Sequence, residues 1–140
     1  MSAPVIDASV VAAALFQEAH AEAASTLLTG SDTLHAPDLL HAEVANVIWK
    51  RHGRGEITVE EAHELATDML SLPLWIAPSA PLVESALELA MRTGRTAYDC
   101  MYLALAVQRD AIMFTADQRL VNALADGPLG PHVRWIGAES

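Results

Sequence analysis

Residues 4–16, PVIDASVVAAALF, show how this chain is organised. A short apolar run ends at Asp7, and an alanine-rich stretch with helical character follows at once. Residues 111–125, AIMFTADQRLVNALA, repeat this order of apolar strand, acidic residue and helix. Strands that alternate with helices are typical of βαβ units, which build a parallel sheet between layers of helices.

The same alternation extends over the whole chain. We expect strands at residues 4–7, 33–36, 74–77, 111–114 and 133–136. We expect helices at residues 9–16, 18–28, 38–52, 58–72, 80–92, 96–109 and 117–125, with Asp38 as the N-cap of the third. No repeat or linker divides them. The sequence therefore predicts an α/β fold, a three-layer α/β/α sandwich with a parallel sheet of about four to five strands, as one domain over residues 1–140.

Composition narrows the class of protein. The chain has 140 residues, a hydrophobic content of 52% and no apolar run of the roughly 20 residues that a membrane span needs. The absence of a signal-like start predicts a cytoplasmic protein without membrane contact. Cys100, the only cysteine, lies in an apolar helical run and is expected to be buried. The net charge of -10 argues by itself against a nucleic-acid partner and for a basic partner or a cation-binding cleft.

Four carboxylates stand at the points where catalytic groups are expected in such folds. Asp7 and Asp117 follow strands, and Glu43 and Asp99 lie in the first turns of helices that start from the same sheet edge. A buried carboxylate without a partner is costly, and four in one cleft would also repel one another. Because the chain has a single lysine, Lys50, we expect a divalent metal to neutralise them. Carboxylates without histidine or thiolate favour Mg²⁺ or Mn²⁺.

Each acid also has a purely structural alternative. Glu43 could be a boundary residue that pairs with Lys50, and Asp99 could reach back to the start of its own helix in a capping box. Asp117 could be an ordinary N-cap. Asp7 has the fewest such partners, a neighbouring hydroxyl and backbone N–H groups, and is therefore the acid for which function is favoured most.

Taken together, these segments resemble a known family. Asp7-Ala-Ser9, Glu43-Val-Ala-Asn46, Asp99 before Tyr102-Leu-Ala-Leu-Ala106, and Thr115-Ala-Asp117 are similar in order and spacing to the PIN-domain ribonucleases, and more narrowly to the VapC-type toxins of bacterial toxin–antitoxin pairs. The resemblance extends from Val5 to about Leu124. It implies a PIN-like fold in which the four acids are catalytic and bind metal, supported by Ser9, Asn46 and Thr115.

The resemblance also implies an activity and partners. It predicts a Mg²⁺-dependent endoribonuclease that leaves 5'-phosphate and 3'-hydroxyl ends, with Mn²⁺ as a substitute, a cognate antitoxin as partner and a homodimer as the assembly. The basic residues expected to hold the RNA backbone are Lys50, Arg51, Arg54, Arg95 and Arg119. Trp49 and Trp75 are candidate dimer contacts, although packing in the core would explain them as well.

The residues argue against two of three other functions that an acidic α/β domain could have. A phosphorelay receiver domain needs a lysine after a late strand, whereas Lys50 lies in a mid-chain helix. A haloacid-dehalogenase-type phosphatase needs Asp-x-Asp after the first strand, where this chain has Asp7-Ala-Ser9. A catalytically silent PIN-like module whose acidic cleft binds a basic peptide remains as the alternative.

Overall fold

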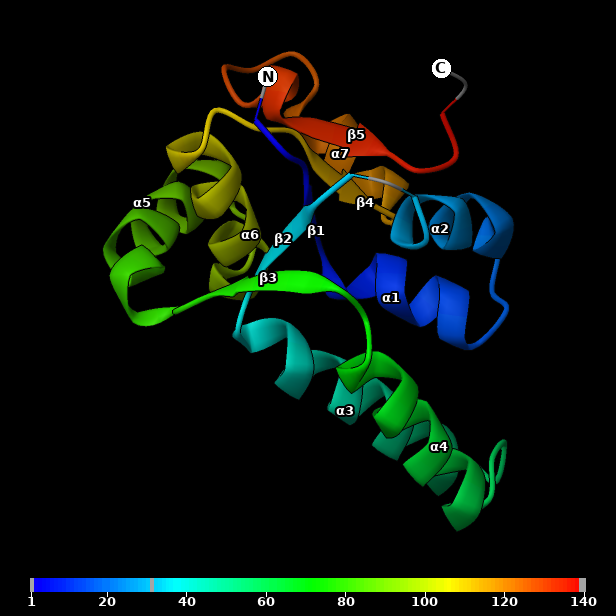
Figure 1. The fold of residues 1–140 in the computed structure, drawn as a ribbon. Helices are drawn as coiled ribbons and strands as arrows, with labels where there is room; N and C mark the ends of the chain where they lie inside the picture. Colours follow the sequence, from blue (N-terminus) through cyan, green and yellow to red (C-terminus); the bar gives the residue numbers. More distant parts are fainter. Residues whose placement is uncertain (1, 31, 139–140) are drawn as a thin grey trace.

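The computed structural model describes residues 2–30 and 32–138 (Figure 1). In these residues a single parallel sheet forms with the strand order β3-β2-β1-β4-β5. The strands are β1 (Val5–Ile6), β2 (Leu34–Pro37), β3 (Leu74–Ala77), β4 (Met113–Thr115) and β5 (Val133–Trp135). This sheet confirms the predicted strand–helix alternation.

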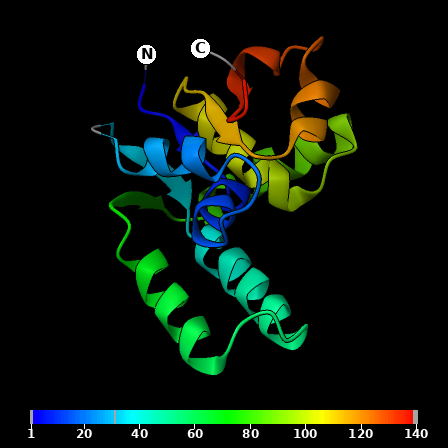
Figure 2. The same cartoon turned by 90° about the vertical axis from the view of Figure 1, so that its right-hand side faces the viewer.

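Helices cover both faces of the sheet. They are α1 (Ala8–Leu15), α2 (Ala21–Leu28), α3 (Leu39–Gly53), α4 (Val59–Leu70), α5 (Val83–Thr93), α6 (Ala97–Gln108) and α7 (Gln118–Leu124). The described residues also form two 3₁₀-helices: η1 (Ala80–Leu82), which leads into α5, and η2 (Gly130–His132), which leads into β5. In Figure 1, α1 and α2 lie on one face, and α5 and α6 on the other. The α3–α4 hairpin projects beyond the sheet, as Figure 2 also shows. The three-layer architecture is therefore confirmed.

The core is centred on β1 and α6. Residues 100–106 of α6 are all buried, which agrees with the prediction of a helix packed on more than one side. Cys100 is among them and is buried, as expected. None of the helices in the described ranges is long and apolar enough to cross a bilayer.

The topology puts a switch point beside β1. The chain runs from β1 outward to β2 and β3 on one side, then returns to β4 and β5 on the other. The ends of β1 and β4 are bonded to each other: the Asp7 N–H, just after β1, donates to the Phe114 carbonyl of β4 at 3.3 Å, and the Ala116 N–H, just after β4, donates to Ser9 Oγ at 2.8 Å. Ligands of open parallel sheets bind at such a point, outside the carboxyl ends of the strands.

Two helix starts differ from the prediction by more than one residue. Helix α2 begins at Ala21 rather than at Glu18, because Gln17 and His20 adopt positive φ angles of 51° and 66° that interrupt the helix. The segment predicted as one helix from Ala80 begins as the 3₁₀-helix η1, which contains a proline in its first turn, and continues as α5.

Asp38 stands at the N-cap position of α3, as predicted, but its side chain does not supply the cap. The Asp38 side chain makes no capping hydrogen bond; its Oδ1 instead accepts a hydrogen bond from Ser79 Oγ. The Ser79 hydroxyl in turn accepts the Leu39 N–H at 3.2 Å. A residue from the start of η1 therefore caps the helix that carries Glu43.

Trp49 and Trp75 do not pack in the core. Each is 66% exposed, so core packing as their explanation is wrong. Trp75 stacks on His35 with ring centroids 6.2 Å apart. Their part in a dimer stays a prediction.

The Ser79 cap makes a first prediction. Ser79→Ala should lower the free energy of unfolding by about 1 kcal/mol, because it removes the acceptor for the Leu39 N–H and leaves the start of α3 uncapped. Urea unfolding measures this change. Ser71→Ala, whose hydroxyl bonds only to the carbonyl of Thr67 in its own exposed helix, is the matched control and should stay within about 0.5 kcal/mol of the parent protein. Equal effects of the two substitutions would contradict the cap.

Candidate active site

A cleft of about 660 Å³ opens at the carboxyl ends of the strands. The structure brings the four predicted acids to this one cleft from four separate segments. Its lining includes these residues from the predicted set: Asp7, Ser9, Glu43, Asn46, Lys50, Asp99 and Asp117. The physical reason is the one expected, since the segments after β1 and β4 and the starts of α3 and α6 meet at this edge.

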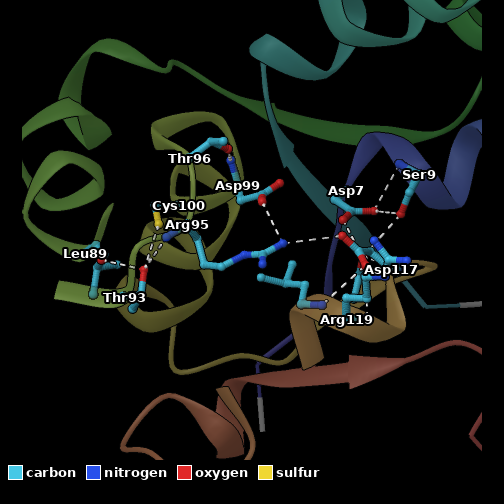
Figure 3. A network of polar contacts seen from close by, with 12 residues as sticks. Asp7, Ser9, Leu89, Thr93, Arg95, Thr96, Asp99, Cys100, Asp117 and Arg119 are labelled. Atoms are coloured by element: carbon cyan, nitrogen blue, oxygen red, sulfur yellow. Dashed lines mark hydrogen bonds and ion pairs between the residues drawn. The ribbon is translucent and has the colours of Figure 1, made fainter. Parts of the chain in front are cut away.

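Asp7 is the most enclosed of the acids, at 6% exposure. Its Oδ1 accepts hydrogen bonds from the backbone of Ser9 at 3.1 Å and of Val10 at 3.3 Å, and so caps α1. The Ser9 hydroxyl donates to the same oxygen. Thr115 Oγ1, fully buried, donates to Oδ2 at 2.6 Å. The carboxylate is therefore fixed by the first turn of α1 and by the last residue of β4; Figure 3 shows Ser9 beside Asp7.

Burial dominates the ionisation of Asp7. It raises the pKa from 3.8 to about 6, although the hydrogen bonds from Ser9, Thr115 and Val10 act to lower it, and the charge of Asp99 raises it further. The site holds this carboxyl group in a place where its negative charge is costly without a cation.

Glu43 is held by Tyr102. The Tyr102 hydroxyl donates to Glu43 Oε1 at 2.6 Å, so in the described part of the chain Glu43 is oriented by this bond rather than by Lys50. Burial raises the pKa of Glu43, the bond from Tyr102 lowers it, and the charge of Asp99 raises it. Burial also raises the pKa of the Tyr102 phenol, which keeps it a donor. One Glu43 oxygen is thus fixed toward α6.

Asp99 and Asp117 share a cation from their own chain. An Arg95 guanidinium nitrogen lies 3.7 Å from Asp99 Oδ2 and 3.6 Å from Asp117 Oδ2, between the two carboxylates (Figure 3). Burial raises the pKa of Asp99, the charge of Arg95 lowers it, and Asp117 raises it. The expectation of a divalent metal as the neutralising cation did not consider this arginine.

The structural alternatives hold in part. Asp117 is the N-cap of α7, because its Oδ1 accepts the N–H groups of Arg119 and Leu120 at 3.0 and 3.3 Å. At the start of α6, Thr96 Oγ1 accepts the Asp99 N–H at 3.1 Å, which is one half of a capping box. Asp117 still presents its Oδ2 to Arg95, so capping leaves one oxygen for the cleft.

Comparison with known proteins is decisive for the family. The PIN domain model matches residues 5–124. The chain belongs to the PIN domain family. Ribonuclease VapC3 of Pyrobaculum aerophilum is 33% identical over 118 residues, which cover 83% of this chain and 90% of that protein. Ribonuclease VapC9 of Mycobacterium tuberculosis is 29% identical over 116 residues, covering 83% and 87%.

Solved structures share the fold. The toxin VapC20 of Mycobacterium tuberculosis, described as cleaving the sarcin-ricin loop, superposes with a TM-score of 0.68 at 18% identity, covering 86% of this chain and 95% of that one. A toxin–antitoxin complex from Klebsiella pneumoniae gives 0.64 at 17% identity, covering 95% and 96%. The family model, the similar sequences and the similar structures therefore confirm the predicted family and fold, those of a VapC-type PIN domain.

The donor set suits a hard divalent cation. As the side chains stand, no three His, Cys, Asp or Glu side chains within residues 2–30 and 32–138 are grouped closely enough to hold a metal. All four acids nevertheless present oxygen atoms to one cleft, and a guanidinium cation already lies between two of them. Oxygen donors of this kind are those that Mg²⁺ and Mn²⁺ prefer. The residues present thus fit such an ion in chemistry and in charge.

The predicted basic residues are not all at the cleft. Lys50 lines it, and Arg119 lies in the first turn of α7, where its backbone N–H donates to Asp117. Arg51 lies elsewhere: it pairs with Glu18 and covers the ring of Phe16 at 4.5 Å. This placement gives Arg51 a structural partner and leaves it outside the cleft lining.

Sequence reasoning missed the two tyrosines of the cleft. Tyr102 follows Asp99 by three residues, and this i,i+3 spacing on one helix face could have indicated that the two lie side by side. Tyr98 is 61% exposed and lines the cleft. Because Tyr98 is exposed, the spacing of apolar residues along α6 does not indicate that it lies beside the cleft; the structure shows this position.

The pKa of Asp7 makes a second prediction. Because the pKa of Asp7 in the folded protein lies above 3.8, folding favours the protonated carboxyl group. The stabilisation that protonation of Asp7 gives is fully present below about pH 4 and is lost as the pH rises through about 6. At about pH 8 the charge lowers the free energy of unfolding by up to about 3 kcal/mol. Without added metal, Asp7→Asn should therefore gain stability over the parent protein as the pH rises from 4 to 8.

Urea unfolding at several pH values in the presence of a chelator measures this difference. Asp126→Asn, an exposed change of the same chemistry, is the control and should show no such trend. A stability difference for Asp7→Asn that is constant between pH 4 and pH 8 would rule out the raised pKa.

Proposed function

We propose that this PIN domain is a divalent-metal-dependent endoribonuclease that acts as the toxin of a toxin–antitoxin pair. The observation that supports this most is the convergence of four acids from four segments on one cleft, with Asp7 buried there. The chain is also similar to proteins named as VapC ribonucleases. The substrate class is therefore RNA, and the reaction is phosphodiester hydrolysis.

The four acids would hold the metal. Asp7, Glu43, Asp99 and Asp117 supply the oxygen ligands for Mg²⁺, with Mn²⁺ as a substitute. When bound, such an ion acidifies a water molecule and stabilises negative charge on the reacting phosphate. The residues behind the acids orient them: Ser9 and Thr115 fix both oxygens of Asp7, and Tyr102 fixes one oxygen of Glu43. Outer-shell hydrogen bonds of this kind are worth about 10- to 100-fold in metal affinity or activity.

The RNA would lie over the mouth of the cleft. Lys50, which lines the cleft, and Arg119, which follows Asp117 by two residues, would contact the phosphates beside the acids. Tyr98 presents an exposed ring at the same mouth, which suits stacking on a base. Since the protein carries a net charge of -10, neutralisation of the acids is a condition for RNA to approach.

A cognate antitoxin is the proposed protein partner. One solved structure of the same fold is a toxin–antitoxin complex from Klebsiella pneumoniae, and another is VapBC2 from Rickettsia felis bound to a DNA fragment from their promoter. In this chain, exposed Trp49 on α3 offers apolar surface, and the acidic cleft offers a binding place for an arginine of the partner. A homodimer is proposed on the family resemblance.

Cleavage of RNA makes the third prediction. The purified protein should cut a panel of structured RNAs with Mg²⁺ or Mn²⁺ and not with a chelator. Asp99→Asn should lower the rate by about 100-fold or more, because it removes a metal ligand. Gel or sequencing detection of new 5'-phosphate ends measures this.

Asp126→Asn, the same chemical change at an exposed turn, should retain full activity. If the Asp99→Asn protein cleaved RNA as fast as the parent protein, the activity would come from a contaminating nuclease. Absence of cleavage on every RNA, together with tight binding of basic peptides, would instead identify a catalytically silent binding module.

A further inference from the structure

We infer that Arg95 is the resident counter-cation of the acidic site, and that a divalent metal has to displace its guanidinium group from Asp99 and Asp117. The inference rests on the proposed function, because it concerns how the same site is loaded. It assigns Arg95 a role in the control of metal affinity, in addition to the contact with RNA that the sequence predicted.

The geometry places one cation between two carboxylates of separate elements. Asp99 lies in the first turn of α6 and Asp117 caps α7, and the same terminal nitrogen of Arg95 contacts both, at 3.7 and 3.6 Å (Figure 3). Asp99 and Asp117 line the cleft, and the side chains of Arg95, Asp99 and Asp117 are 28%, 32% and 42% exposed, so solvent reaches this group of charges. A metal that enters from solvent would therefore meet Arg95 at the acids.

Apart from the two ion pairs, the arginine is anchored through its backbone. Gly94 ends α5 with a φ angle of 74°, and the Arg95 N–H donates to Thr93 Oγ1 at 3.1 Å. The Arg95 Nε is buried and has no hydrogen-bond partner in the described residues. The two ion pairs are also longer than the 2.7–2.9 Å typical of charge-assisted hydrogen bonds. The side chain can therefore leave while the backbone stays in place.

Charge favours the exchange. One guanidinium group offsets half of the formal charge of two carboxylates, whereas a divalent ion offsets all of it. The two cations repel each other, so they do not share the position between Asp99 and Asp117. Because only the fraction of molecules with Arg95 displaced can take up metal, the apparent affinity is reduced by that fraction.

Metal binding without RNA provides the fourth prediction. Mn²⁺ titration of the full-length protein, followed by electron paramagnetic resonance of the free ion, should show that Arg95→Gln binds about three- to tenfold more tightly than the parent protein. Arg95→Lys, which keeps the charge without the forked geometry, should fall between the two. Thermal melts should show a lower melting temperature for Arg95→Gln without metal, and a larger rise when Mn²⁺ is added.

Arg92→Gln is the matched control. Arg92 pairs with Glu88 on the exposed face of α5, so its substitution changes the net charge equally without touching the cleft acids. It should bind Mn²⁺ as the parent protein does. The inference would be overturned if Arg95→Gln, Arg92→Gln and the parent protein bound Mn²⁺ with equal affinity, or if Arg95→Gln bound it more weakly. Either result would leave the proposed metal site intact. No Mn²⁺ binding by any variant would refute both the inference and the proposed metal site.

Discussion

The burial of the Asp7 carboxylate at the switch point is the constraint on which the rest of the site depends. The neighbouring strands β1 and β4 end side by side, and this side chain joins the first turn of α1 to the end of β4: Ser9 donates to one of its oxygens and Thr115 to the other. The same carboxylate caps α1. Asp7 is therefore both a structural link and the innermost acid, which explains why a costly charge is tolerated there. The remaining acids take their places around it because α3, α6 and α7 start from the same edge.

Electrostatic repulsion is the opposing force in this arrangement. Burial raises the pKa values of Asp7, Glu43 and Asp99, and each of them is raised further by another acid of the cleft. Hydrogen bonds from Tyr102, Ser9 and Thr115 offset part of this effect without removing the negative charge. A site of this kind gains stability from any cation that reaches it. In the absence of a divalent ion, Arg95 provides one positive charge for two of the four acids.

The sequence was sufficient for the sheet, the layers and the convergence of the acids. Those features follow from local patterns, namely apolar strands that end in an acid and helices that begin there, together with the rule that parallel strands present their carboxyl ends to one edge. It was insufficient wherever a partner comes from a distant segment. The hydroxyl that caps α3 belongs to Ser79, some 40 residues from Asp38, and the hydroxyl that holds Glu43 belongs to Tyr102 on another helix. The exposure of Trp49 and Trp75 was also beyond reach, since apolar residues on a projecting hairpin or an edge strand look like core residues in sequence.

A crystal structure of the protein soaked with Mn²⁺, with anomalous diffraction measured above the manganese edge, tests the shared cation site most directly. We expect an anomalous peak within the cleft from an ion coordinated by oxygen atoms of Asp7, Glu43, Asp99 and Asp117, with the Arg95 guanidinium no longer between the last two. A cleft without an anomalous peak, with Asp7 or Asp99 turned away from the other acids, would contradict it.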